Sequence, residues 1–453
     1  MRINKQKAEL DMLHGSLSGK ILRFALPLAL TGVLQQLFNA ADVAVVGRFA
    51  GKNAMAAVGA NTAIVGLVIT LFIGISIGAN VVIAMAIGHG SVQRIRNAVH
   101  TALLFALLGG VGVFILGEAV SSPLMRILGV PDEVFQMAVN YLRIYLCGMP
   151  VILFYNFEAA ILRAKGDTRS PLIALTTAGI INVILNLFFV IRCHMSAGGV
   201  ALATVLANIV SAGILLYVLS RSEDAVQVHI NELRIHRDTL GSVLRIGLPA
   251  GMQSAVKSIA NVLIQSAINS LGSTVMAGSS AAFNVEVVVF LVLDAFGQTC
   301  TTFVGQNYGA EQYDRCKKAL FTCLVEDIIA TGLAIAFLAY FGRSLLSLFN
   351  SSPEVIDAGM IRMRYLMFGF VFSMCNEVQS GYLRGFGISL PPALISLIGV
   401  CGIRIIWIFA VFPSHHTFSG LMKVYPLSLS VAAVTTFVML LIMQPSRRLR
   451  TGG

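Results

Sequence analysis

The chain alternates long apolar runs with short polar segments from residue 21 to residue 443. A helical run of about 18 or more apolar residues is long enough to cross the hydrocarbon core of a bilayer. We count twelve such runs, roughly at 21–46, 55–87, 97–119, 134–162, 171–191, 198–220, 243–270, 276–305, 317–340, 355–383, 392–412 and 419–443. The pattern predicts an all-α polytopic membrane protein with twelve transmembrane helices.

Charge and composition fit this class of protein. Charged residues make up 12% of the chain, about half of the roughly 25% that is usual in soluble domains. The net charge of +11 needs no nucleic-acid partner, because 21 of the 32 Lys and Arg residues fall on one side of the predicted spans and six on the other. Basic loops stay cytoplasmic. We therefore expect a multi-pass protein of the cell (inner or plasma) membrane with both termini in the cytoplasm.

The chain also repeats itself at an offset of about 221 residues. "ILRFALP" at 21–27 recurs as "VLRIGLP" at 243–249, and "ILRAKGDTRSPL" at 161–172 recurs as "YLRGFGISLPPA" at 382–393. Six spans per half give both halves the same direction through the membrane, as in parallel transporter repeats facing a shared central cleft. We predict an N-lobe at 1–220, a polar cytoplasmic linker at 221–240 and a C-lobe at 241–453.

Asp42 is an acid near the outer end of the first apolar run. An ionised carboxylate at membrane depth is costly unless it has a partner or faces water, so it indicates a function. Asn182 and Asn186, one helical turn apart, and Thr204 lie on later spans of the same half. Their oxygens with the carboxylate suit a proton or a sodium ion. The alternative is that these groups only connect helices by hydrogen bonds.

Other polar residues in the spans are candidates for a substrate cleft or for buried ion pairs. The predicted cleft residues share helix faces at spacings of three or four and are Gln35, Asn39, Gln253, Lys257 and Asn261. Three further charges, Glu286, Glu377 and Arg404, have two open interpretations: a structural pair of Arg404 with one of the two acids, or a role in binding substrate.

Several other classes of site and protein are disfavoured. The seven cysteines form no CxxC pair, and the adjacent histidines 415 and 416 have no further ligands at metal spacing. No nucleophile has a neighbouring base at an interpretable spacing. We therefore predict that the protein is not an enzyme and has no cofactor, and no metal apart from sodium at Asp42.

Several motifs resemble the multidrug and toxic compound extrusion (MATE) family. They are "LPLALTGVLQQLFNAADVAVVGRFAG", "RAKGDTRSP", "NVILN" and "FVGQNYGA", and the likeness extends over all twelve spans in order. The resemblance implies a V-shaped pair of six-helix lobes. It also implies a secondary active antiporter that exports small organic, often cationic and aromatic compounds in exchange for protons or sodium.

The resemblance also implies an ion site. In one branch of the family this site uses an Asp on helix 1, an Asn and an Asp on helix 5 and a Thr on helix 6, which match Asp42, Asn182, Asn186 and Thr204. Asn186 replaces the second carboxylate of that pattern. One anion remains, so protonation of Asp42 is the simpler form of coupling.

Two other functions compete with export. A flippase for lipid-linked oligosaccharides would share the two-lobe architecture, and a polytopic lipid-modifying enzyme would need clustered acids or histidines at a membrane face. The expected partners are small organic substrates and membrane lipid. The sequence leaves open the substrate, the coupling ion and the oligomeric state, since a two-lobe transporter can work alone.

Overall fold

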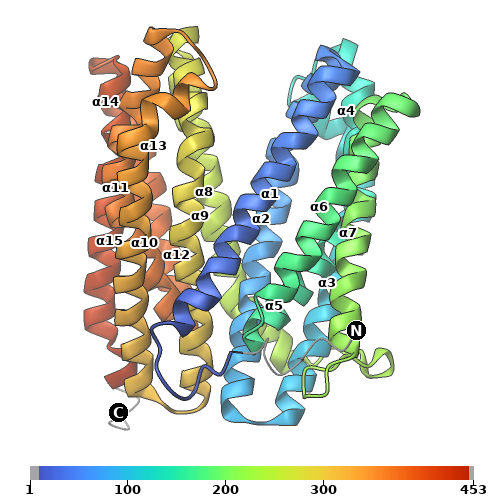
Figure 1. Ribbon diagram of the computed structural model, residues 1–453, viewed down its shortest axis with the longest axis vertical. Helices are drawn as coiled ribbons and strands as arrows, with labels where there is room; N and C mark the ends of the chain where they lie inside the picture. Colours follow the sequence, from blue (N-terminus) through green and yellow to red (C-terminus); the bar gives the residue numbers. More distant parts are fainter. Residues whose placement is uncertain (1–9, 448–453) are drawn as a thin grey trace. The chain divides into compact units, whose positions relative to one another are not determined.

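The computed structural model describes residues 10–447, and no strand occurs within this range. The helices of the first half are α1 (Lys20–Val45), α2 (Lys52–His89), α3 (Val92–Ile127), α4 (Asp132–Cys147), α5 (Met149–Lys165), α6 (Arg169–Leu187) and α7 (Ser196–Ser220). Those of the second half are α8 (Arg237–Asn269), α9 (Ser273–Gly309), α10 (Tyr313–Ser347), α11 (Pro353–Gly385), α12 (Leu390–Ile395), α13 (Ile403–Ile406), α14 (Phe418–Met422) and α15 (Val424–Met443) (Figure 1). Short π-helical or 3-10 segments extend or join these helices at Val46–Ala50, Phe188–Arg192, Ile230–Glu232, Ser396–Gly402, Trp407–Val411 and Phe412–Ser414.

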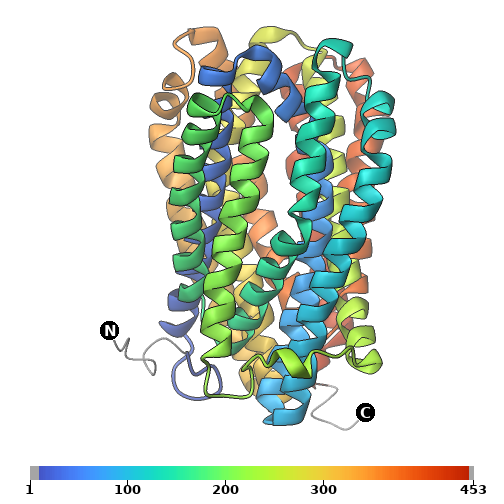
Figure 2. The same ribbon diagram turned by 90° about the vertical axis from the view of Figure 1, so that its right-hand side faces the viewer.

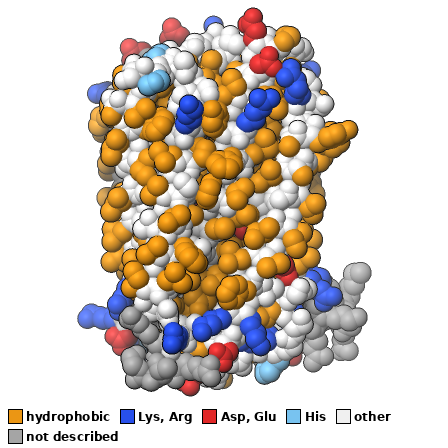
Figure 3. Space-filling view, turned by 90° about the vertical axis from the view of Figure 1, so that its left-hand side faces the viewer, with side chains coloured by type: hydrophobic (Ala, Val, Ile, Leu, Met, Phe, Trp, Pro, Cys, Tyr) orange, Lys and Arg blue, Asp and Glu red, His pale blue; other side chains and the backbone are white. Residues whose placement is uncertain are grey.

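Eleven of the twelve predicted spans coincide with one helical segment each, and the span at 134–162 coincides with the bent pair α4 and α5, which confirms the predicted fold class. By length and composition, nine helical segments of the described chain could cross a membrane, or ten if α4 and α5 form one bent span. The predicted spans in α8 and α11 are not among them, because both helices carry charged and polar residues. On the face shown in Figure 3, hydrophobic side chains cover the middle band and charged ones lie mostly toward the two ends.

The span predicted at 134–162 is two helices rather than one. α4 ends at Cys147 and α5 begins at Met149, with a bend of 47° between them. Pro150 stands at the start of α5. Since proline has no backbone N–H and clashes with the preceding turn, it fits at a helix start and kinks or breaks a helix when it stands in the interior. The sequence "CGMP" at 147–150 explains the break.

The described chain divides into two compact units whose borders lie inside helices. The first unit is built on Leu30–Leu248, and the second on 249–447 together with Met12–Ala29. α1 and α8 therefore each begin in one unit and end in the other, and both contain a proline beside the border, Pro27 and Pro249. The lobe boundaries predicted from the sequence remain a prediction. The linker they contain belongs to the first unit, where Val226 and Val228 pack into the apolar core.

Candidate ion and substrate sites

The four predicted ion-site residues lie together in the first unit. The Asn186 side-chain amide, on α6, donates to the Asp42 carboxylate on α1 at 2.5 Å and to Asn182 Oδ1 at 3.1 Å. The Asn182 amide approaches Thr204 Oγ1 on α7 at 3.4 Å, and that hydroxyl donates to the carbonyl of Val200 at 3.0 Å. Helices α6 and α7 run side by side (Figures 1 and 2). A chain of polar groups thus joins three helices.

The contact between α1 and α6 depends on a glycine. Phe38 on α1 lies against Gly179 on α6, and a Cβ at Gly179 would lie 1.9 Å from the nearest carbon of the Phe38 ring. Only a residue without a side chain fits at this place. Because Asn182 follows Gly179 by three residues and Asp42 follows Phe38 by four, this contact brings the carboxylate and the amides together.

Asp42 lies at a small cavity and has no basic partner among the described residues. The cavity measures about 90 Å³ and is also lined by the predicted cleft residues Gln35 and Asn39. A water molecule needs at least about 10–15 Å³ of such space, so several fit. No Lys or Arg of the described chain pairs with Asp42. A cation can therefore reach this carboxylate without displacing a salt bridge.

The site also contains a buried acceptor that lacks a donor. Asn186 is fully buried and its Oδ1 has no hydrogen-bond partner within residues 10–447. A lone buried amide oxygen costs roughly 1–3 kcal/mol, and a bound cation or a hydrated proton would satisfy it. Oxygen atoms from a carboxylate, an amide and a hydroxyl are the hard ligands that such cations prefer. The residues present thus fit either ion.

Glu158 is a buried acid that the sequence analysis did not identify. Glu158, on α5, is fully buried, and both of its carboxylate oxygens lack a hydrogen-bond partner in the described chain. It lies in a run that reads as apolar, "NFEAAIL", and a lone acid in such a run was the available signal. Its repeat-related position holds Gln379, whose Oε1 is also buried without a partner.

Basic and acidic residues of the second unit form pairs that the sequence did not predict. Arg362 on α11 binds Glu286 on α9 with its Nη2 at 2.6 Å and its Nε at 3.1 Å. Lys257 on α8 pairs with Glu377 on α11. Of the two interpretations that the sequence left open, the pair of Arg404 with Glu286 or Glu377 is not formed, because packing between α8, α9 and α11 gives each acid another basic partner.

A second cavity, of about 300 Å³, lies within the second unit. Lys257 and Asn261, two of the predicted cleft residues, line it together with Glu286 and Arg404. Gln253, another predicted cleft residue, is 3% exposed, and its side-chain amide donates to Ser396 Oγ at 2.6 Å. Glu377 is also buried, and neither Gln253 nor Glu377 lines this cavity.

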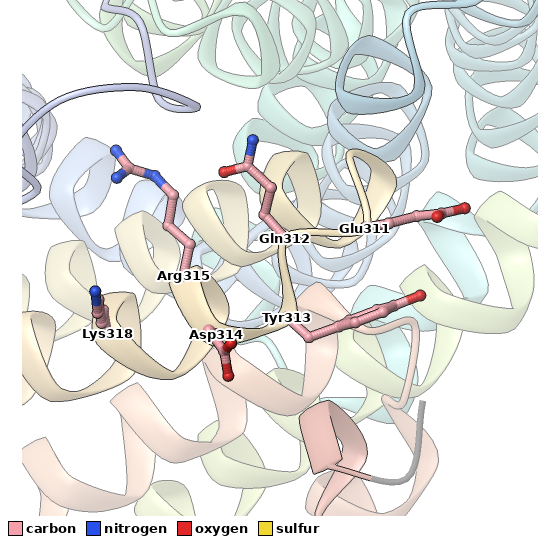
Figure 4. Close-up of a pocket in the computed structure, with 6 residues that line it drawn as sticks. All are labelled: Glu311, Gln312, Tyr313, Asp314, Arg315 and Lys318. Atoms are coloured by element: carbon pink, nitrogen blue, oxygen red, sulfur yellow. The ribbon is translucent and has the colours of Figure 1, made fainter. Parts of the chain in front are cut away.

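A third cavity does not resemble a ligand site. It measures about 430 Å³ and lies at the connection between α9 and α10, lined by Glu311, Gln312, Tyr313, Asp314, Arg315 and Lys318. Figure 4 shows that these side chains do not converge: Glu311 and Tyr313 point one way, while Gln312 and Arg315 point another. Arg315 is already bound to backbone carbonyls of Met12, His14 and Gly15.

The described chain contains no group of three or more His, Cys, Asp or Glu side chains that could hold a metal ion. All seven cysteines are free, and Cys300, Cys316, Cys323 and Cys401 are buried. A buried free cysteine behaves as a small hydrophobic residue.

Comparison with known proteins gives consistent matches. A family model described as MatE matches residues 27–188 and again 249–409. "Probable multidrug resistance protein YoeA" of Bacillus subtilis is 26% identical over 91% of each chain. A "FAD transporter" of Shewanella oneidensis is 27% identical over 76% of this chain and 78% of its own.

A solved structure shows the same fold. It is titled as an outward-facing conformation of a multidrug resistance MATE family transporter, and it matches with a TM-score of 0.89 and 23% identity over 98% of this chain and 99% of that one. The family model matches once in each predicted half and covers well over half of the residues. This chain therefore belongs to the MatE family of multi-pass membrane transporters.

Proposed function

We propose that this protein is a secondary active antiporter that exports organic compounds in exchange for protons bound at Asp42, with sodium as the alternative coupling ion. The observation that carries the proposal is the environment of Asp42. Its carboxylate lies at a cavity, has no basic partner in the described chain and accepts a hydrogen bond from Asn186. Such a group can gain and lose a cation.

The mechanism follows from the hydrogen bonds of this site. As an anion, Asp42 accepts from the Asn186 amide, and hydrogen bonds to charged groups contribute about 1.5–3 kcal/mol. Protonation removes the charge and turns one carboxyl oxygen into a donor. The chain from α1 through Asn186 and Asn182 to Thr204 must then rearrange. A bound ion shifts a conformational equilibrium only by its difference in affinity for the two states, and this rearrangement supplies such a difference.

The orientation and the transport cycle are part of the same proposal. The excess of basic residues on one side of the spans supports cytoplasmic termini and a location in the cell membrane. The two repeats would alternate access to a substrate site between inside and outside. A single chain contains both repeats, so a monomer suffices for the cycle.

Transport in proteoliposomes tests the proposal. We expect a proton gradient imposed alone to drive export of a fluorescent organic substrate, and Asp42→Asn to reduce that export to the level of protein-free liposomes. Glu118→Gln is a matched control, because Glu118 is a half-exposed acid of α3 that lies 3.3 Å from Arg143. The control should transport normally.

Two results would contradict the proposal. Undiminished export by folded Asp42→Asn would remove the coupling role of this acid. Failure of both proton and sodium gradients with the wild-type protein would instead favour a flippase of the same architecture. The names of the relatives, a multidrug resistance protein and a FAD transporter, differ in substrate, so the substrate class must be argued from the second cavity.

A further inference from the structure

Arg404 is a buried cation that has no anionic partner in the described part of the chain. Its side chain belongs to α13 and the residue is 4% exposed. The other basic residues at the second cavity are neutralised, Lys257 by Glu377 and Arg362 by Glu286. Within residues 10–447 no carboxylate lies within ion-pair distance of Arg404. A buried charge is normally paired, so this one needs an explanation.

The groups around Arg404 hold it in place but leave its charge uncompensated. Nη1 donates to Asn261 Oδ1 at 2.7 Å, and Nε donates to Ser428 Oγ at 3.3 Å. The guanidinium lies 4.4 Å from the centre of the Tyr425 ring. All three partners are neutral. Nη2 makes no hydrogen bond in the described part of the chain and is not sealed from solvent, so two of its N–H groups are available to a ligand.

The cavity beside Arg404 has the walls of a site for a ring compound. Phe283, Phe290, Phe370 and Tyr425 line it. Its volume of about 300 Å³ is at the lower end of the range for small-molecule sites. A compound with a single ring or with two fused rings fits this space. Aromatic rings favour offset or edge-on contact with such walls.

The charges that line the cavity favour a negative ligand. Its lining contains three basic residues, Lys257, Arg362 and Arg404, and one acid, Glu286. The pairs Lys257–Glu377 and Arg362–Glu286 are each neutral overall. The positive charge of Arg404 therefore remains as the net charge at the cavity. A planar guanidinium with available donors binds a carboxylate or a similar oxyanion with two parallel hydrogen bonds. An organic cation would meet repulsion at the same place.

We propose that the second unit contains a binding site for aromatic anions, in which Arg404 binds the anionic group and the phenylalanine-lined wall holds the ring. This inference rests on the proposed export function, for which it names a substrate class. It differs from the cationic compounds that the family resemblance implies.

Binding to the full-length protein in detergent, without any gradient, tests the site. Three probes share one ring system and differ in charge: naphthalene-2-carboxylate, the neutral naphthalene-2-carboxamide and the cationic 2-naphthylmethylammonium. We expect calorimetry to show that the carboxylate binds at least ten times tighter than the carboxamide and that the ammonium binds most weakly. Equal affinity for all three probes would overturn the proposal.

Two variants locate the site. Arg404→Gln should abolish the preference for the carboxylate. Asn261→Asp keeps Arg404 and the oxygen that accepts its hydrogen bond. It replaces the amide nitrogen by a second oxygen and so supplies an internal anion, and we expect the same loss of preference in a protein that stays folded. Arg364→Gln is the matched control, since Arg364 is exposed on the same helix as Arg362 and does not line the cavity. An unchanged preference in Asn261→Asp would refute the role of Arg404.

A competition experiment separates aromatic ligands from simple anions. Acetate and chloride should displace naphthalene-2-carboxylate only at concentrations at least ten times higher, because they lack the ring. If either competes equally well, the site is an inorganic or small-anion site and the proposal is wrong. Asp42→Asn should keep the order of preference among the three probes even if its overall affinity changes, because Arg404 is intact. Lost transport with an unchanged order of preference in that variant would separate the coupling mechanism from the substrate site.

Discussion

The contact between Gly179 and Phe38 predicts a specific effect of one added methyl group. A Cβ at position 179 would lie 1.9, 2.1 and 2.3 Å from three carbons of the Phe38 ring. Non-bonded carbons prefer about 3.5–4.0 Å. The ring must therefore move by about 1.5 Å or α1 must separate from α6 by a similar distance. Overpacking of this kind costs about 1–3 kcal/mol.

We expect Gly179→Ala to lower both stability and transport. Phe38 precedes Asp42 by one helical turn, so a displaced ring moves the carboxylate away from the Asn186 amide. A thermal unfolding assay on purified protein should show a lower midpoint, and gradient-driven export in proteoliposomes should fall further than the stability loss alone explains.

Two further variants make this prediction sharp. Phe38→Ala removes the ring that clashes, so adding Gly179→Ala to the Phe38→Ala variant should cost no further stability. Gly213→Ala, in the adjacent α7, adds a methyl group with no atom within 4 Å, and alanine is the better helix former by about 1 kcal/mol. That variant should be unchanged or slightly more stable. Normal stability and transport in Gly179→Ala would refute the reasoning about this contact.

Three other predictions concern the charges inside the two units. Asn186→Asp adds a second carboxylate beside Asp42 and should increase the stimulation of export by sodium at constant pH; an unchanged response would place α6 outside the ion site. Glu286→Gln should destabilise the second unit by about 3–5 kcal/mol in chemical unfolding, because it leaves Arg362 buried without an anion. Adding Arg362→Met should recover most of the loss. A double variant as unstable as the single one would contradict this. Glu158→Gln removes an acid that has no hydrogen-bond partner in the described chain, so unfolding should show no loss of stability, and a marked loss would reveal a partner for the carboxylate.

The local arrangement of the ion-site residues could be predicted from the sequence because it depends on helix periodicity. Asn182 and Asn186 are four residues apart, so they share a face of α6 in any α-helix. The repeat at 243–249 of the motif at 21–27 likewise predicted that α1 and α8 would correspond. The break between α4 and α5 also had a signal in the sequence, since Pro150 stands in the middle of the run at 134–162. That run was nevertheless interpreted as one span.

Pairing between helices could not be predicted in the same way. Arg362 and Glu286 are 76 residues apart, and which acid faces which base depends on the rotation and register of two packed helices. A pair of Arg404 with one of two acids was one of two open interpretations, and in the structure both acids have other basic partners. Glu158 was missed although it gave the same signal as Asp42, a single acid in an apolar run. That both of its carboxylate oxygens lack a partner in the described chain depends on packing and could not be predicted from the sequence.

The exchange of helix starts between the two units has a consequence for how this molecule can be divided. A fragment cut in the linker would lose residues that its own core uses: the first half would lack Val243, which packs in the core of the first unit, and the second half would lack Phe24, whose ring contacts Phe303 at 5.8 Å. A half-length ancestor could have completed both cores by domain swapping, in which each of two copies packs the first turns of its first helix into the other copy. Gene fusion would then have joined the two swapped copies in one chain.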